Sequence, residues 1–358
     1  MKKSYLNGMS CISAQPTAAE EDFFQIEPIS YHTPVFKAHN ADYKKYIKPV
    51  AMRRMSQSVK MGVSAAFMAL EEAAIKKPDA ILTGTGRGCR QDSEIFLETI
   101  LENNEEFLTP IKFIQSTHNT VGGRIALELD CSAYNFTYVQ DAVSFESALM
   151  DAHLCILNDP EMNQVLVGGI DELAKNSVEL HKQDGYIKQE TEVHNLDLLD
   201  HKTNGTLASE GAAFFVLSKE KNEKTYAELV DAEIYNQASQ KEMEQHIDRF
   251  LKNNNLSLEE IDVVILGNNG DLEFDFYYEN LQNGIFKHTE QLYYKHLMGD
   301  HHTVSSVGVW LAAKILKQQL IPNFLKLTTK KTKKPFKNTL LYNQNRGRNH
   351  SLVLLSAC

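Results

Sequence analysis

Three short apolar runs that end in glycine constrain the fold of this chain most strongly. They are residues 80–86 (AILTGTG), 164–169 (QVLVGG) and 262–267 (DVVILG). Runs of this length that stop at glycine are typical of strands buried on both faces of a sheet. Residues 91–102, after the first run, and residues 303–319 have the pattern of helices. The alternation predicts an α/β fold, with a mostly parallel sheet covered by helices in each half of the chain.

The rest of the chain fits two similar α/β halves packed into one compact unit. Further strands are expected at residues 5–12, 135–140, 212–218 and 226–235. A helix is expected at residues 53–74, because apolar residues recur there at intervals of three and four: Met55, Val59, Val63, Phe67 and Leu70. Residues 113–129 should form a loop that enters a helix, and residues 182–206 a polar connection. No long linker intervenes, so the halves are placed at residues 1–200 and 201–358.

Residues 138–153 (YVQDAVSFESALMDAH) join a predicted strand to a predicted helix. Many enzymes mount a nucleophile at such a turn, because the unpaired N–H groups and the positive end of the helix dipole stabilise a thiolate or an oxyanion. This turn contains no cysteine. The position typical of a nucleophile is therefore present without the nucleophile.

Composition excludes several classes of function. The 358 residues carry a formal net charge of −10, which disfavours nonspecific nucleic-acid binding. The five cysteines are scattered and lack CxxC spacing, so neither a disulfide framework nor a zinc site is indicated, and no cofactor is expected. No stretch approaches the ~18 apolar residues of a membrane helix, and the first fifteen residues lack a signal-peptide core. We expect a cytoplasmic protein with proteins or small acyl groups as partners.

Four segments give the chain a family resemblance. They are GGIDE (168–172), GTLASEGA (205–212), HTVSSVG (302–308) and RNHSLV (348–353). In order and approximate spacing they resemble the β-ketoacyl synthase family, which has the thiolase fold with layered α-β-α-β-α architecture. The resemblance spans nearly the whole chain. Two further segments, QSTHNTVGG and SFESALMDA, look like those of ketosynthase-like subunits encoded with aryl polyene and flexirubin pathways.

The resemblance implies a site whose catalytic residues are largely replaced. A working ketosynthase of this family uses a cysteine nucleophile, two histidines and a Lys/Glu pair. The cysteine position falls on Ala142, which cannot be acylated, and the first histidine falls on Asn269, which cannot exchange a proton near neutral pH. The second histidine is retained as His302. Lys295 stands near the family lysine, and the glutamate position falls on the apolar Leu311.

The resemblance also implies an altered entrance. Where the family has a gate rich in glycine and phenylalanine, this chain has Asn343, Gln344, Asn345, Arg346 and Gly347. Amides and a charge change both the flexibility and the polarity of such a loop. Asp271 and Glu273 stand where the family has threonines that bind a phosphopantetheine arm. These replacements argue against ordinary entry of a thioester.

Other interpretations of the same residues stay open. Ser144 with His302 could form a substitute nucleophile and base, although no carboxylate that would orient the base is evident. His302 could equally be a core histidine at a helix start. A metal cluster of His118, Asp300 and His301 is disfavoured, because the adjacent histidines point in different directions. The lysines of residues 326–337 could attract an acidic acyl carrier protein or form a solvated loop. GTGRG favours a backbone turn over a nucleotide loop, because no Walker lysine follows.

The function implied is a ketosynthase-like subunit of polyketide or fatty acid biosynthesis that does not condense alone. It would act as a chain-length factor: it pairs as a heterodimer with an active ketosynthase, receives the acyl carrier protein through that partner, and shapes the product tunnel. The strand of residues 135–140 is expected at the interface. The tunnel and interface residues implied are Phe113, Ile114, Thr117, His118, Asn135, Thr137 and Val139. The alternative enzyme is a malonyl carrier protein decarboxylase or acyltransferase that uses His302 and Asn269.

Overall fold

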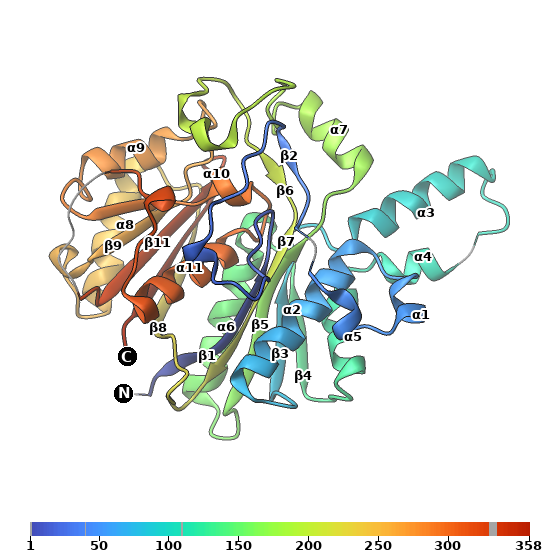
Figure 1. Cartoon of the computed structure of the whole chain (residues 1–358), viewed down its shortest axis with the longest axis horizontal. Coiled ribbons are helices and arrows are strands. Elements are labelled where there is room, and N and C mark those ends of the chain that lie inside the picture. Colours follow the sequence, from blue (N-terminus) through green and yellow to red (C-terminus); the bar gives the residue numbers. More distant parts are fainter. Residues whose placement is uncertain (1, 40, 109, 329–334) are drawn as a thin grey trace.

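The computed structural model describes residues 2–39, 41–108, 110–328 and 335–358 (Figure 1). Its strands are β1 (Ser4–Ile12), β2 (Val35–Phe36), β3 (Ala80–Gly84), β4 (Tyr134–Tyr138), β5 (Gln164–Asp171), β6 (Ala208–Ser209), β7 (Gly211–Ser218), β8 (Ala227–Asn236), β9 (Val263–Leu266), β10 (Glu290–Tyr293), β11 (Asn338–Asn345) and β12 (Asn349–Ser356). Its α-helices are α1 (Pro49–Met52), α2 (Gln57–Ala73), α3 (Arg90–Glu102), α4 (Pro110–Gln115), α5 (Thr120–Glu128), α6 (Ser144–Asn158), α7 (Lys175–Gln183), α8 (Gln240–Asn253), α9 (Phe276–Asn283), α10 (Lys295–Met298) and α11 (Ser305–Gln318).

One sheet of ten strands runs through the molecule in the order β10-β9-β11-β12-β8-β1-β7-β5-β3-β4. It divides into two half-sheets of the same design, β4-β3-β5-β7-β1 and β10-β9-β11-β12-β8. In each, the three outer strands are parallel, and the next two strands are antiparallel to their neighbours. The half-sheets meet where Ser4–Leu6 of β1 pairs with residues 227–229 of β8. The prediction of two related halves is confirmed.

The outer strands of each half pair in parallel, as predicted, whereas the inner strands pair antiparallel. Antiparallel strands can follow each other through a tight turn, whereas parallel strands need a long crossover. Only Arg346–Arg348 separate β11 from β12, so these strands form a hairpin. The apolar run that predicts a strand does not encode its direction.

Helices and sheets alternate in layers (Figure 1). The helices α6 and α11 lie in the middle: α6 contacts β3, β5 and β8, while α11 contacts β11, β7 and β1. On the outer face of the first half-sheet, α2 packs against β1, β5 and β7. The apolar side chains of α8 pack against β9, β11 and β12 on the outer face of the second. This is the predicted α-β-α-β-α architecture of the thiolase fold.

Alternating side chains explain why both faces of the first half-sheet are covered. Val165 and Val167 of β5 belong to the central apolar cluster with Phe145 of α6. Leu166 points the other way, into the cluster that contains Val63 of α2. Because successive residues of a strand face opposite sides, a continuous apolar run needs a helix on each face.

The glycine that ends β3 lets α6 start directly against the sheet. A Cβ atom at Gly84 would lie 2.4 Å from the carbonyl oxygen of Ser144, closer than real carbon atoms approach. Any other residue would push away the first turn of α6. This contact fixes the strand-to-helix turn singled out in the sequence.

Two predicted elements are wrong in their bounds. The expected helix of residues 53–74 starts later than predicted, because α1 ends at Met52 and α2, which ends at Ala73, starts only at Gln57. Part of the expected loop of residues 113–129 is helical, since α4 spans Pro110–Gln115. The division at residue 200 stays a prediction; β7, which lies beyond it, pairs with β1 and β5. Within the described part of the chain, no helix has the length and apolar character needed to cross a bilayer.

Candidate functional site

The site lies where the carboxyl ends of β3 and β5 meet the starts of α6 and α11. Asp171, at the end of β5, holds the surrounding loops together. Its Oδ1 accepts bonds from the hydroxyl of Thr85 at 3.0 Å and the N–H of Gly86 at 2.9 Å. Its Oδ2 accepts from the N–H and the hydroxyl of Thr303, both at 2.9 Å. One buried carboxylate therefore fixes the loop that carries Arg87 relative to the loop that carries His302.

The central contact is a hydrogen bond between His302 and Asp141. The Nε2 of His302 lies 2.9 Å from Oδ1 of Asp141, and Arg87 lies 3.3 Å from the same oxygen. Asp141 has a positive φ of 55°, a conformation that aspartate adopts more readily than most residues. The hydrogen bond from His302, with the charges of Arg87 and Arg348, lowers the pKa of Asp141 against the opposing effect of burial.

Ala142, the predicted site of the missing cysteine, is buried in the short turn that follows Asp141. Its neighbour Asp141 is the residue that faces His302, and sequence reasoning missed it. The Ser144 hydroxyl donates to the carbonyl of Asp141 at 2.7 Å and accepts from the N–H of Gln140 at 2.8 Å. Both bonds lie within its own turn. No contact between Ser144 and His302 is found among the described residues, so their role as nucleophile and base stays a prediction.

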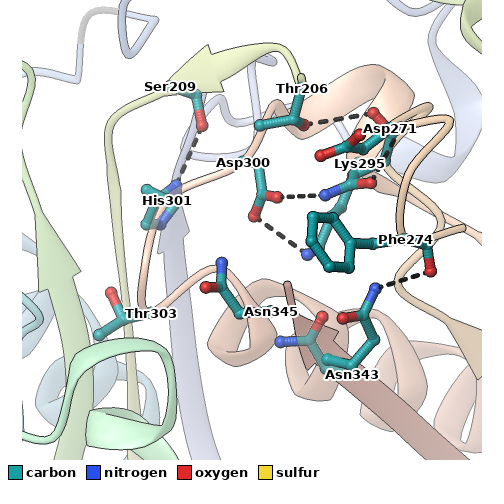
Figure 2. Close-up of polar contacts among 12 residues, drawn as sticks. Thr206, Ser209, Asp271, Phe274, Lys295, Asp300, His301, Thr303, Asn343 and Asn345 are labelled. Atoms are coloured by element: carbon teal, nitrogen blue, oxygen red, sulfur yellow. Dashed lines mark hydrogen bonds and ion pairs between the residues drawn. The ribbon is translucent and has the colours of Figure 1, made fainter. Parts of the chain in front are cut away.

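Lys295 and Asn269 meet at a different carboxylate, that of Asp300. Figure 2 shows Lys295 beside Asp300. The Lys295 ammonium lies 3.0 Å from Oδ1 of Asp300, and both side chains are 2% exposed. The Asn269 amide donates to Oδ2 of Asp300 at 2.8 Å. Leu311, where the resemblance implies a glutamate, lies in the apolar core. Asp300 therefore supplies the negative charge that neutralises Lys295.

His301 turns away from this cluster, toward Ser209 (Figure 2). Its Nδ1 lies 3.0 Å from the Ser209 hydroxyl, and its Nε2 has no hydrogen-bond partner among the described residues. Burial lowers the pKa of His301 to about 4, so the imidazole is neutral near pH 7. The adjacent histidines thus face different surroundings, as expected. No group of three metal-ligating side chains exists within the described residues.

The predicted gate residues reach His302 through Tyr186. The Asn345 amide donates to the Tyr186 hydroxyl at 2.8 Å, and the guanidinium of Arg346 lies 5.6 Å from the centre of the Tyr186 ring. That ring lies nearly parallel to the His302 imidazole, with centroids 6.3 Å apart. Asn343 is buried, and its side-chain oxygen is 3.5 Å from the hydroxyl of Tyr278. Tyr186 lies in a segment predicted only as a polar connection, and no sequence pattern indicated its place beside His302.

Three of the predicted tunnel and interface residues, Asn135, Thr137 and Val139, lie on β4 or directly after it, at the edge of the first half-sheet. The side-chain amide of Asn135 donates to the carbonyl of Gly122 at 2.9 Å, and the hydroxyl of Thr137 lies 2.8 Å from that of Thr83. Val139 remains exposed. A Cβ atom added at Gly88 would lie 3.0 Å from the α-carbon of His118. The loop before α5, which carries His118, therefore touches the loop that carries Arg87. The edge and the site are therefore neighbours.

An apolar groove of about 920 Å³ lies between α1, α2, α4 and α5. Ile114 and Thr117 line it, together with Val50, Met55 and Leu127. Phe113 and Ile114 are more than half exposed, so α4 presents apolar side chains to solvent. The groove is large enough for a ligand the size of a lipid or drug molecule.

Comparison with known proteins agrees with this architecture. The family model described as Beta-ketoacyl synthase, N-terminal domain, matches residues 3–223. No curated protein matches the sequence. Among solved structures, the ishigamide ketosynthase/chain length factor is 16% identical with a TM-score of 0.83, covering 100% of this chain and 99% of that one.

Two further complexes share the fold. One is AntDE:AntF, a type II PKS acyl-carrier protein in complex with its ketosynthase bound to the hexaketide. It is 13% identical, with a TM-score of 0.83, and the match covers 100% of this chain and 100% of that one. The ketosynthase ApeO in complex with its chain length factor ApeC, from Xenorhabdus doucetiae, is 12% identical, with a TM-score of 0.74, covering 100% of this chain and 98% of that one. At such identities the likeness shows the fold alone. Since the family model spans more than half of the sequence and the layered architecture agrees with it, the chain belongs to the β-ketoacyl synthase family.

Proposed function

We propose that this chain is a non-condensing, chain-length-factor type subunit that pairs with an active β-ketoacyl carrier protein synthase. The observation that carries the proposal is the pairing of Asp141 with His302 at 2.9 Å. In this family a thiol at the strand-to-helix turn takes the acyl chain, and here a carboxylate faces the retained histidine. A carboxylate held by a histidine and an arginine is a weak nucleophile, and an acyl anhydride formed on it would hydrolyse rather than persist as a thioester does.

The proposed partner is a ketosynthase that docks on the β4 edge. This strand ends the sheet, and its side chains Tyr134 and Phe136 are 44% and 47% exposed. An open strand with exposed aromatic residues is a template for pairing with another chain. The resemblance places the dimer strand of the family at this edge. The acyl carrier protein would reach the pair through the ketosynthase, in the cytoplasm.

The proposed pathway class is aryl polyene or flexirubin-like biosynthesis. Its support is the pair of sequence segments around the site, QSTHNTVGG and SFESALMDA. The first runs along the apolar groove, where Thr117, Asn119 and Gly123 are among the lining residues. A growing polyene needs an apolar enclosure, and a partner surface placed over this groove would provide one.

The decarboxylase alternative uses His302 and Asn269 to stabilise an enolate. Its support is that His302 is only 12% exposed and borders a cavity. Against it, His302 is paired with Asp141, and the Asn269 amide already donates to Asp300. Release of carbon dioxide from malonyl carrier protein, lost on His302→Ala, would establish this alternative.

Intact-protein mass spectrometry tests the proposal. After incubation with acyl carrier protein thioesters, the chain should carry no acyl group, while the co-purified ketosynthase should carry one on its cysteine. An acyl adduct on Ser144 would refute the non-condensing role.

Two variants test the geometry: a thiol in Asp141→Cys would face His302, whereas one in Ala142→Cys would be buried in the turn. We expect the first variant to be acylated and the second to be acylated at least about tenfold more slowly.

A further inference from the structure

The hairpin between β11 and β12 has an unusual residue at its tip. Both central residues of its turn, Arg346 and Gly347, have positive φ, of 48° and 63°. A type I′ turn requires this conformation at both positions, and asparagine followed by glycine is the usual pair. Arginine at the first position costs free energy, because its Cβ atom crowds the backbone there. An unfavourable residue in such a conformation points to a role for its side chain.

The side chain of Arg346 lies between two aromatic rings. Its guanidinium carbon is 5.6 Å from the centre of the Tyr186 ring and 5.6 Å from that of the Phe274 ring. Both distances are within the range of a cation–π contact. Arg346 makes no ion pair within the described part of the chain, where the paired arginines are Arg87, Arg90 and Arg124. The two rings are therefore the groups that hold this guanidinium.

Hydrogen bonds fix the tip of the hairpin in place. The N–H of Gly347 donates to Oε1 of Gln344 at 2.9 Å, and the N–H of Gln344 donates to the hydroxyl of Tyr278 at 2.9 Å. The carbonyl of Arg348 accepts from the N–H of Gln237 at 2.7 Å. The tip is therefore a rigid base for the side chain that it carries.

The Tyr186 ring transmits the position of the hairpin to His302. Its hydroxyl accepts from the Asn345 amide at 2.8 Å, and its plane lies 13° from that of the His302 imidazole, with ring centres 6.3 Å apart. The Tyr186 backbone is fixed as well, because its carbonyl accepts from the N–H of Thr206 at 3.0 Å. The His302 ring also packs against Gly86, where an added Cβ atom would lie 2.3 Å from its Cγ atom. These contacts leave the His302 side chain only 12% exposed.

We propose that the hairpin is a closed latch, in which Arg346 keeps the Tyr186 ring over His302 and shuts the approach to the histidine from this side. The side chain of Asp141 is 47% exposed, so the approach past this carboxylate stays open. A ligand that enters from the hairpin side would first have to lift the Tyr186 ring, and the contacts of Arg346 oppose that movement. The latch would act whether or not a ketosynthase is bound.

Modification of histidines by diethyl pyrocarbonate tests the latch on the full-length protein, with peptide mass spectrometry as the readout. In the wild type, His302 should react more slowly than His288, which is exposed. Arg346→Asn removes the guanidinium and gives the turn its usual residue, so the hairpin should stay folded. His302 should then react about fivefold to thirtyfold faster, the change in opening expected when two cation–π contacts are lost.

Two comparisons separate the latch from a general loosening of the fold. Tyr186→Phe keeps the ring beside Arg346 and should keep most of the protection of His302, whereas Tyr186→Ala should lose it. Arg53→Asn, which replaces an exposed arginine directly after α1, should leave the reaction of His302 unchanged. Circular dichroism of each variant confirms that it is folded before its reaction is interpreted.

Three results would overturn the proposal. They are equal reaction of His302 and His288 in the wild type, an unchanged rate for His302 in both Arg346→Asn and Tyr186→Ala, and an equal increase in Arg53→Asn. Neither acyl transfer nor partner binding is measured, so failure here leaves the proposed pairing with a ketosynthase intact.

Discussion

The two half-sheets have the same strand order and directions, yet their outer edges differ. At the edge of the second half, β10 is covered by its own chain: the N–H of Leu327 donates to the carbonyl of Gln291 at 2.9 Å, and Glu290, Gln291 and Leu292 are buried. At the edge of the first half, β4 exposes Tyr134 and Phe136. Since the two halves share one design, the open edge is a specific feature of the first half. The comparison indicates where a partner would bind.

Charging the open edge should have the largest effect. Phe136→Lys should weaken binding of the ketosynthase partner at least ~100-fold, because a buried, unpaired ammonium at the centre of an interface is costly. The isolated variant should stay folded, since Phe136 is 47% exposed in the single chain. Co-purification and size-exclusion chromatography provide the readout.

The matched control for this edge lies in the second half. Leu320, just beyond α11, is 39% exposed, and Leu320→Lys should leave the complex intact. Equal loss of the partner in both variants would mean that the exposed β4 edge is not the docking surface.

Breaking the buried ion pair of the second half should have the next largest effect. Lys295→Met leaves Asp300 without its cation in a site where both side chains are 2% exposed. The free energy of unfolding should fall by about 3–5 kcal/mol, measured by urea denaturation. The double variant Lys295→Met/Asp300→Leu should recover part of this loss. A single variant as stable as the wild type would show that Lys295 does not neutralise Asp300.

The contact between Asp141 of the first half and His302 of the second should contribute much less to stability. Asp141 and His302 are 47% and 12% exposed, so solvent screens their attraction. Asp141→Asn should cost less than about 1 kcal/mol near neutral pH. Because the folded-state pKa of Asp141 is lowered, its stabilisation is present above the unfolded pKa of about 3.9 and disappears as pH falls through the folded value.

Urea denaturation between pH 3 and 7 measures this difference. The gap between wild type and Asp141→Asn should narrow as pH falls below about 4. Asp248→Asn, which removes an exposed helical pair with Lys252, is the control from the second half. A gap that widens in acid would reverse the assigned direction of the pKa shift.

The sequence predicts strands in both halves and misses contacts in both. Glycine-ended apolar runs identify β3, β5 and β9, because close packing at Gly84 leaves no room for a side chain. The turn before α6 was recognised because a β-prone run leads directly into a segment with helical spacing. The role of Asp141 was missed: its side chain faces His302 through a positive φ of 55°, and no pattern of residue types encodes that conformation.

Long-range pairs were harder still to predict. Asp300 follows Lys295 by five residues, but the family pattern directs attention to residue 311, so their pairing emerges only from the fold. Tyr186 and Asn345 are far apart in sequence and meet at 2.8 Å. The lysine run of residues 326–337 was predicted as a docking segment or a solvated loop, and its central residues 329–334 lie outside the described residues.

A substitution at Thr117 should have the smallest effect on stability and partner binding. It should nevertheless change the length of the product. Among the described residues, the Thr117 hydroxyl has two hydrogen-bond partners, the carbonyl of Ile114 at 3.3 Å and the hydroxyl of Thr120 at 3.0 Å, at the rim of the apolar groove. In Thr117→Trp the indole would fill space in the groove rather than displace a packed core, so stability and partner binding should change by less than about 1 kcal/mol. If the groove encloses the polyene, the product should be shorter, and its absorption maximum should move to shorter wavelength. Lys252→Trp, on the outer face of α8, should leave the spectrum unchanged. An unchanged spectrum from a stable complex that contains Thr117→Trp would mean that this loop does not line the product tunnel. The β4 edge would remain the proposed docking surface, because steric control of product length does not act on the affinity between the subunits.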